Sequence, residues 1–219
     1  MSFLEPPTES RCRRLPHGWR VHEQADACRS AAFGFVWSAR APWGKRELAR
    51  WLAGPYAAAI AATREPVAAR ATAQAIRLRP VSDDAVRELV AWSYARVIAT
   101  LHSLGRWRDD PRFARRMIDG GIVVGVIDAT SEIGYAPVAA REMRLADRVS
   151  SLFVADFLTR PGDYARFQVC GACQGATFES RAEHARACTS AAADPGPRPA
   201  VKRRSARRIT LLGLGDRVA

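Results

Sequence analysis

Three cysteines and one histidine near the carboxyl end of the chain have the residue types and spacing of metal ligands. Cys170 and Cys173 are separated by two residues, ten residues follow, and three residues then separate His184 from Cys188. A Cys-x2-Cys turn points two thiolates at one ion, and two side chains four positions apart on a helix share a face. Four such ligands complete the tetrahedron of Zn²⁺ and leave no open position. We therefore expect these four side chains to hold a structural zinc ion.

The residues between the two ligand pairs favour a hairpin followed by a helix. Thr177 and Phe178 suit a return strand, and residues 180–183 (SRAE) match a capping box that would begin the helix carrying the last two ligands. The segment 167–188 resembles a small zinc finger of the Cys-Cys-His-Cys type, a relative of the ββα fingers. It departs from the ββα pattern in having ten rather than about twelve residues between the inner ligands, and its helix contains no leucine. We therefore expect it to pack against the main domain.

A second set of metal-ligand types lies near the amino end, at Cys12, His17, His22 and Cys28. The gaps in this set are long and contain no paired-ligand turn, so the sequence favours surface histidines and ordinary thiols and leaves a metal role open. The chain has five cysteines in all, three of them within the 19 positions from 170 to 188. An odd number clustered in this way fits a metal site in a reducing compartment better than a disulfide framework.

The elements that must position these ligands are expected to be mostly helical. Ser82 is a good N-cap for the longest helix, Gly105 is well placed to end it, and Pro137 would open the last one. The expected helical ranges are 45–53, 55–63, 66–78, 82–105, 111–119 and 137–160. Residues 122–127 (IVVGVI) predict a short β-strand. Because one strand cannot satisfy its own edges, we expect it to pair with 33–38 (FGFVWS) or to lie as a buried extended segment.

The composition divides the chain into four parts. An irregular amino-terminal arm (1–30) precedes a helical main domain (31–162), which has one or two short strands. A small ββα-like zinc finger (163–190) and a disordered basic tail (191–219) follow. The tail starts with small residues and prolines and continues with the basic run 202–208 (KRRSARR).

Net charge indicates an anionic partner. The chain has 34 Lys and Arg against 22 Asp and Glu, a net charge of +12. From 194 to 219 there are seven basic and two acidic residues, a net of +5. Flexible arginines neutralise phosphates whatever the nucleotide sequence. We therefore expect nucleic acid to bind through Arg203, Arg204, Arg207 and Arg208. Arginine-rich composition also follows from G+C-rich coding, and the tail could serve solubility alone.

One further segment indicates a protein partner, and another bears on nucleic-acid binding. The apolar residues of 209–214 (ITLLGL) could form a docking peptide, and the protein would then be a zinc-stapled adaptor for another protein. Residues 48–60 loosely resemble the first helix, the turn and the start of the second helix of a helix-turn-helix. In this resemblance the turn glycine, Gly54, comes one place late and Pro55 replaces the usual polar cap.

An enzymatic function is not indicated by any common motif. The sequence contains no Gly-rich phosphate loop, no Gly-x-Ser-x-Gly elbow and no His-Glu-x-x-His pair, and we identify no small-molecule substrate. His102 could act as a general base if Asp109, Asp110 or Asp128 oriented it, which leaves an unrecognised enzyme as the remaining alternative. We find no secretory signal or membrane-spanning segment and expect a cytoplasmic protein.

Overall fold

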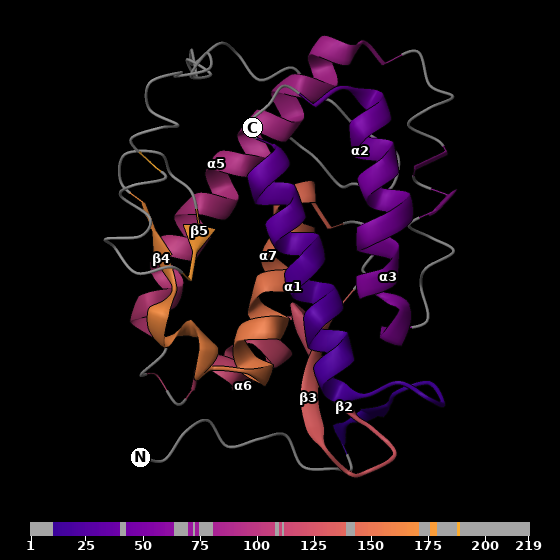
Figure 1. Cartoon of the computed structure of the whole chain (residues 1–219), viewed down its shortest axis with the longest axis vertical. Coiled ribbons are helices and arrows are strands. Elements are labelled where there is room, and N and C mark those ends of the chain that lie inside the picture. The colour runs from indigo at the N-terminus through magenta and orange to yellow at the C-terminus, as the bar shows by residue number, and fades with distance from the viewer. Residues whose placement is uncertain are drawn as a thin grey trace.

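The computed structural model describes residues 11–39, 43–63, 70, 71, 73, 74, 81–107, 110, 112–138, 143–170, 176–178 and 188. Its centre is helix α7 (Leu145–Thr159), which packs against α1 (Val21–Ser38), α5 (Asp83–Trp107) and strand β3 (Ile133–Pro137) (Figure 1). Residues on all sides of α7 are buried, including the run 151–158. A helix that is covered on every side is the core of its domain. The protein is therefore mostly helical, as the sequence predicted.

Two expectations for the amino-terminal region are wrong. We expected an irregular arm up to residue 30 and a strand at 33–38. A single helix, α1, runs through both segments. Its buried residues follow helical spacing, but after Val21 the buried positions near its start are Gln24, Ala25 and Cys28, which are polar or small. A face built from such residues gives a weak apolar period, so the helix is hard to recognise from hydropathy alone.

A three-stranded sheet lies at the amino-terminal end of α1 (Figure 1). The predicted strand is confirmed as β2 (Val123–Ile127), but its partners are β1 (Arg13–Arg14), which is parallel to it, and β3, which is antiparallel. The tight turn between β2 and β3 places Ser131 at φ 64°. The expected pairing with 33–38 was therefore wrong, since those residues belong to α1.

Pro137 does not open a helix. It is the last residue of β3, opposite Val123, and the last long helix begins eight residues later at Leu145. Proline is tolerated at the end of an edge strand, where its missing N–H costs no ladder hydrogen bond. Strand β3 can approach α7 closely because Gly134 faces Thr159 and Val21, and a Cβ at this position would collide with Val21. The Tyr135 amide donates a hydrogen bond to Thr159 Oγ1 at 3.0 Å.

Residues 45–63 form one continuous helical column where two helices and a sharp turn were expected. Helix α2 (Lys45–Trp51) passes through a π-helical turn, η2 (Leu52–Tyr56), into α3 (Ala57–Ala59) and then into the 3₁₀ turn η3 (Ala61–Thr63) (Figure 1). In an α-helix the ring of Pro55 would clash with the carbonyl four residues earlier, and the wider π turn relieves that clash. The helix-turn-helix resemblance of 48–60 is therefore wrong. Of the expected helix 66–78, only 70, 71, 73 and 74 are described, and all four are helical.

Helix α5 confirms the prediction made from its cap, whereas α6 (Phe113–Asp119) ends where predicted but has Arg112, and not Asp110, as its N-cap. Helix α5 begins where expected, and the Ala85 amide donates to Ser82 Oγ at 3.2 Å, although the helix runs two residues past Gly105. Helix α6 stops at Gly120, and the Arg112 amide donates to Asp110 Oδ1 at 2.9 Å. No helix in the described part of the chain is both long and apolar enough to cross a membrane.

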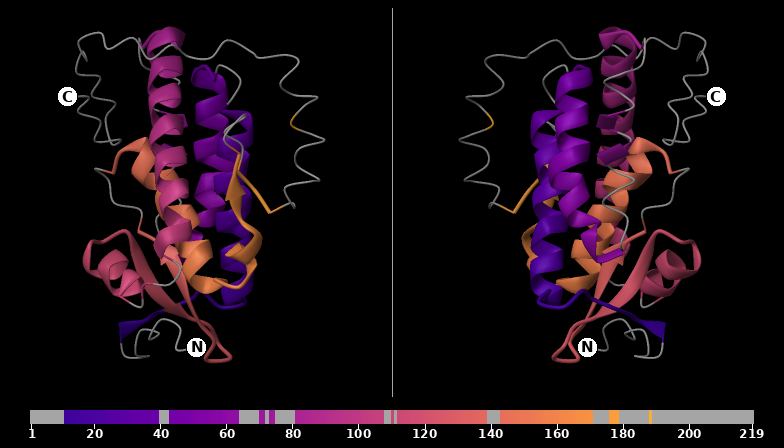
Figure 2. Two further views of the ribbon diagram at one scale, coloured as in Figure 1. Left: turned by 90° about the vertical axis from the view of Figure 1, so that its left-hand side faces the viewer. Right: turned by 90° about the vertical axis from the view of Figure 1, so that its right-hand side faces the viewer.

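The end of the described chain is a small hairpin that packs on the helices. A 3₁₀ turn, η4 (Asp163–Arg166), leads into β4 (Gln168–Val169), which pairs antiparallel with β5 (Ala176–Thr177). Strand β4 lies against α5, and β5 lies against α1 (Figure 2). The return strand expected at Thr177 is thus present. The capping box at 180–183 and the tail 191–219 lie outside the described residues.

Candidate metal centre and the ion network beneath it

Two of the four expected metal ligands lie side by side at the hairpin. Cys170 directly follows β4, and its Sγ is 3.7 Å from Sγ of Cys188, which is 7% exposed. Two thiolates bound to one tetrahedral zinc ion at about 2.3 Å would lie roughly 3.8 Å apart. A disulfide would instead hold the two sulfurs about 2.0 Å apart. The separation excludes a disulfide and fits either an S–H···S hydrogen bond or two thiolates on one metal ion.

The other two expected ligands, Cys173 and His184, lie outside the described residues. Within the described ranges, no three His, Cys, Asp or Glu side chains are grouped so that they could hold a metal ion. The described half of the proposed site thus consists of two sulfurs. Thiolate is a ligand type that zinc prefers, and the chemistry of this half is compatible with zinc.

An aromatic cluster joins the hairpin to the main domain. It consists of Phe167 and Phe178, which flank the two strands, Tyr164 from η4 and Phe33 from α1. The ring of Phe178 is centred 5.1 Å from Tyr164, 5.3 Å from Phe33 and 5.5 Å from Phe167. Two of these contacts are edge-to-face, the arrangement that the ring quadrupoles favour. The hairpin therefore shares the hydrophobic core of the main domain.

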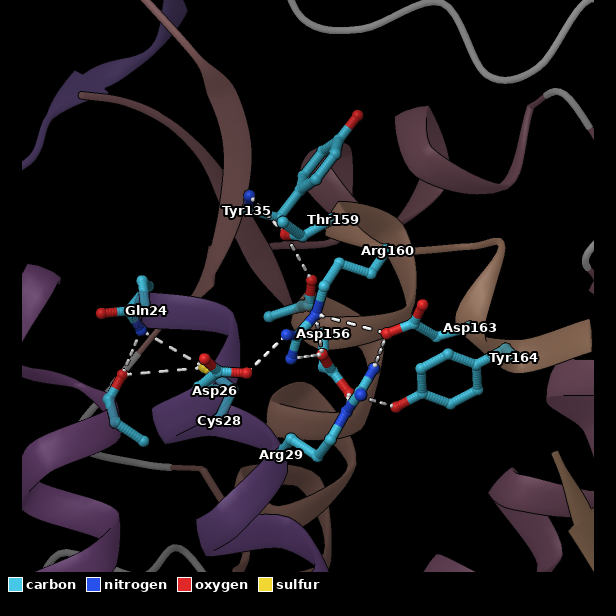
Figure 3. A network of polar contacts seen from close by, with 12 residues as sticks. Gln24, Asp26, Cys28, Arg29, Tyr135, Asp156, Thr159, Arg160, Asp163 and Tyr164 are labelled. Carbon is cyan, nitrogen blue, oxygen red and sulfur yellow. Dashed lines mark hydrogen bonds and ion pairs between the residues drawn. The ribbon is translucent and has the colours of Figure 1, made fainter. Parts of the chain in front are cut away.

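Arg29 of α1 lies directly beneath this cluster. Its guanidinium carbon is 4.9 Å from the centre of the Phe178 ring and 5.8 Å from that of Tyr164. The same guanidinium donates from Nε to Asp156 and from Nη2 to Asp163, both at 2.8 Å (Figure 3). Arg29 thus connects the aromatic rings of the hairpin to a carboxylate inside the protein.

Asp156 is the centre of the ion network. Its side chain is 0% exposed and accepts hydrogen bonds from Arg29, from Arg160 Nη2 at 2.7 Å and from Tyr164 Oη at 2.7 Å (Figure 3). Arg160 also bonds to Asp26 of α1. Burial, and next the nearby Asp156 charge, raises the pKa of the Tyr164 hydroxyl well above its ordinary value, so this hydroxyl remains a donor. A buried charge needs such compensation to be tolerated.

Residue spacing in the sequence does not reveal this network. Its one local signal is an acid inside the apolar run 152–158 (LFVADFL), where an unpaired charge would be costly. That signal indicates that Asp156 needs a partner, but the partner Arg29 is 127 positions away.

The amino-terminal set of metal-ligand types is not brought together. Cys28 is buried against α3, and burial raises the pKa of its thiol to about 12. Gln24 Nε2 donates to this sulfur at 3.3 Å and also to the Ala59 carbonyl. His17 and His22 are exposed. Cys28 therefore belongs to the packing between α1 and α3, and these residues do not form a metal site.

The acids considered as partners of His102 have structural roles instead. His102 is exposed on α5, and Asp109 lies outside the described residues. Asp110 precedes α6, accepts a hydrogen bond from the Arg112 amide and forms an ion pair with Arg116. Asp128 accepts hydrogen bonds from the amides of Val21, Thr130 and Glu132 and therefore holds the β2–β3 turn against the start of α1. In the described part of the chain, no hydrogen bond links His102 to Asp110 or Asp128.

The four arginines expected to bind nucleic acid, Arg203, Arg204, Arg207 and Arg208, lie outside the described residues. Comparison of the chain with protein-family models, with curated proteins and with solved structures finds no match.

Proposed function

We propose that the chain binds one structural zinc ion through Cys170, Cys173, His184 and Cys188. The separation of 3.7 Å between Sγ of Cys170 and Sγ of Cys188 carries this proposal, because it joins two ligands that are 18 positions apart. The β4–β5 ladder supports it as well, since Cys173 belongs to the segment that joins the two paired strands. Three thiolates and one imidazole suit zinc in a closed tetrahedral site.

In this proposal the metal has a structural role. Four protein ligands leave no position for water or a substrate, and the ion cross-links a short hairpin to the residues that follow it. A two-stranded hairpin is marginally stable in water by itself. Zinc-binding free energy would therefore contribute to folding of this module.

Metal analysis of protein purified under reducing conditions tests the proposal. We expect close to one zinc per chain in the wild type and in Cys12→Ser, which alters a half-buried cysteine outside the site. Cys170→Ser and Cys173→Ser should each lower the zinc content strongly, because a hydroxyl replaces a thiolate ligand. Wild-type protein that contains no zinc and takes none up from a zinc salt would refute the proposal.

We further propose that nucleic acid is the partner. The tail arginines Arg203, Arg204, Arg207 and Arg208 would contact phosphates, and the net charge of +12 supports this. A second basic segment, 11–22, contains four arginines and no acid, and all four are exposed: Arg11, Arg13 and Arg14 lie before or on β1, and Arg20 is the N-cap of α1. Exposed arginines on the folded domain and on the tail together would give phosphate binding without sequence preference.

A salt titration separates this partner from a protein partner. Affinity for a duplex of arbitrary sequence should fall steeply as salt rises, because bound phosphates release counterions when arginines neutralise them. Replacing the four tail arginines by glutamine should weaken binding and flatten the salt dependence. If no binding is detected at low salt, nucleic acid is excluded and the zinc-stapled adaptor for another protein becomes the favoured function.

A further inference from the structure

We propose that zinc binding at the hairpin and the ion network around Asp156 are thermodynamically coupled through Phe178 and Arg29. Metal occupancy would then control the stability of the α1–α7 interface as well as that of the hairpin. This inference rests on the proposed zinc site and adds its regulatory consequence for the main domain.

The first step leads from the metal ligands to Phe178. Cys170 is the residue after Val169, and Val169 is paired with Ala176 in the ladder. Phe178 follows the paired residue Thr177 directly. Fixing the Cys170 sulfur next to Cys188 holds the end of β4, and the ladder transmits that position to β5. The ring of Phe178 therefore keeps its place only while the hairpin is formed.

The second step leads from Phe178 to Arg29. The Phe178 ring is 4.9 Å from the Arg29 guanidinium carbon and shields this charge on the hairpin side. The Arg29 side chain is only 26% exposed. A guanidinium over an aromatic face gains electrostatic attraction, and the gain is larger where water is excluded. Loss of the hairpin would hydrate Arg29 and remove this contact.

The third step leads from Arg29 to the core of the main domain. Arg29 is on α1 and Asp156 is on α7, so their hydrogen bond joins the two helices at the centre of the protein. Tyr164 belongs to both sets of contacts, because its ring packs on Phe178 while its hydroxyl donates to Asp156 at 2.7 Å. Any change that moves Phe178 thus disturbs two of the donors that neutralise a fully buried carboxylate.

Coupling of this kind is reciprocal. If zinc stabilises the Arg29–Asp156 contact, then weakening that contact must reduce zinc affinity by the same factor. Arg29 is not a metal ligand in the proposed site. If zinc affinity depended on the ligands alone, replacing Arg29 would not change it. An effect of Arg29 on zinc affinity therefore distinguishes a coupled site from an uncoupled one.

Zinc affinity measured by competition with a chelator is the first test. The mild changes Arg29→Lys and Phe178→Leu should each weaken zinc binding about fivefold or more, the lower end of typical coupling between sites. Arg116→Lys, in an ion pair on α6, is the matched control for the arginine. Trp43→Leu, in an aromatic cluster with Phe35 and Trp51, is the control for a loss of core packing. Both controls should keep wild-type affinity within about twofold.

Amide hydrogen exchange of wild-type protein, with and without zinc, is the second test and needs no variant. Zinc should slow exchange at least about fivefold in α1 around Arg29 and in α7 around Asp156. Exchange in α2 should change little. Protection confined to the hairpin, or unchanged zinc affinity in Arg29→Lys and Phe178→Leu, would overturn the coupling but leave the zinc site standing. A wild-type chain that binds no zinc would overturn both proposals.

Discussion

Two almost fully buried carboxylates, Asp128 and Asp156, are stabilised in opposite ways. Asp128, which is 3% exposed, takes its hydrogen bonds from the hydroxyl and amide of Thr130 and from the amides of Glu132 and Val21. Asp156, which is 0% exposed, is neutralised by Arg29 and Arg160, with the Tyr164 hydroxyl as a third donor. One acid thus relies on uncharged donors, and the other on two cations.

This difference shows what each acid does for the fold. The donors to Asp128 come mainly from its own turn, and its charge also lies near the positive end of the α1 dipole. It therefore shapes a turn and starts a helix. Asp156 is held by Arg29 of α1, 127 positions away, and by Arg160 and Tyr164, which follow it by four and eight positions. Its two cations therefore tie α1 to the carboxyl end of α7. The contrast between a carboxylate held by uncharged donors and one held by two cations can be tested with three variants.

The largest effect is expected for Asp156→Ala. This change leaves the buried Tyr164 hydroxyl without its acceptor and leaves Arg29 and Arg160 with only their more exposed partners Asp163 and Asp26. We expect a loss of about 3–5 kcal/mol in the free energy of unfolding. Urea denaturation followed by circular dichroism measures this loss. Asp163→Ala is the control, because Asp163 contacts the same arginines but is 48% exposed. It should cost less than about 1 kcal/mol, and equal losses in the two variants would contradict the central role of Asp156.

A smaller effect is expected for Tyr164→Phe. This change keeps the aromatic ring against Phe178 and removes only the hydroxyl that donates to Asp156 at 2.7 Å. A hydrogen bond to a charged group contributes about 1.5–3 kcal/mol, and urea denaturation should show a loss in that range. In the double variant with Asp156→Ala, the hydroxyl should no longer contribute, so additive losses would show that the two groups act separately.

Asp128 should give the smallest effect and one that depends on pH. The hydrogen bond from the Thr130 hydroxyl, together with the amide donors, lowers the pKa of Asp128 to about 2, whereas an unfolded aspartate has a pKa of about 3.9. The folded state therefore gains stability from the carboxylate above about pH 4 and loses it as the pH falls through 2. Thermal unfolding should show Asp128→Asn below wild type at pH 7. The difference should shrink between pH 4 and 2, and a constant difference would contradict this origin.

The elements predicted correctly from sequence carry their signals locally. Ser82 caps α5 and Gly120 follows the end of α6, while β2 is a short β-branched run. Each signal lies within a turn or two of the element it specifies. Helix α1 was missed because its buried face near the start uses Gln24 and Cys28, and β3 was missed because Pro137 suits a strand end as well as a helix start.

The candidate site likewise has one part that the sequence predicts and one part that it does not. The cysteine and histidine spacing could be recognised because ligand pairs are close in sequence, and two of the predicted ligands, Cys170 and Cys188, are brought together. The link from Phe178 through Arg29 to Asp156 could not be recognised, because its members become neighbours only when α1 packs on α7. Sequence spacing predicts chemistry within one segment, whereas contacts between segments depend on the packing of the whole core.

The π-helical turn Leu52–Tyr56 marks a position where the chain can change in length. Such a turn holds one residue more than an α-helical turn, so the helices on either side already accommodate an insertion. Deleting Pro55 would remove both the extra residue and the ring that a regular helix rejects. The following residues would stay in phase, and Tyr56 would still meet Arg148, whose Nη1 donates to its hydroxyl at 3.0 Å. Homologous chains that are one residue shorter should have their gap here.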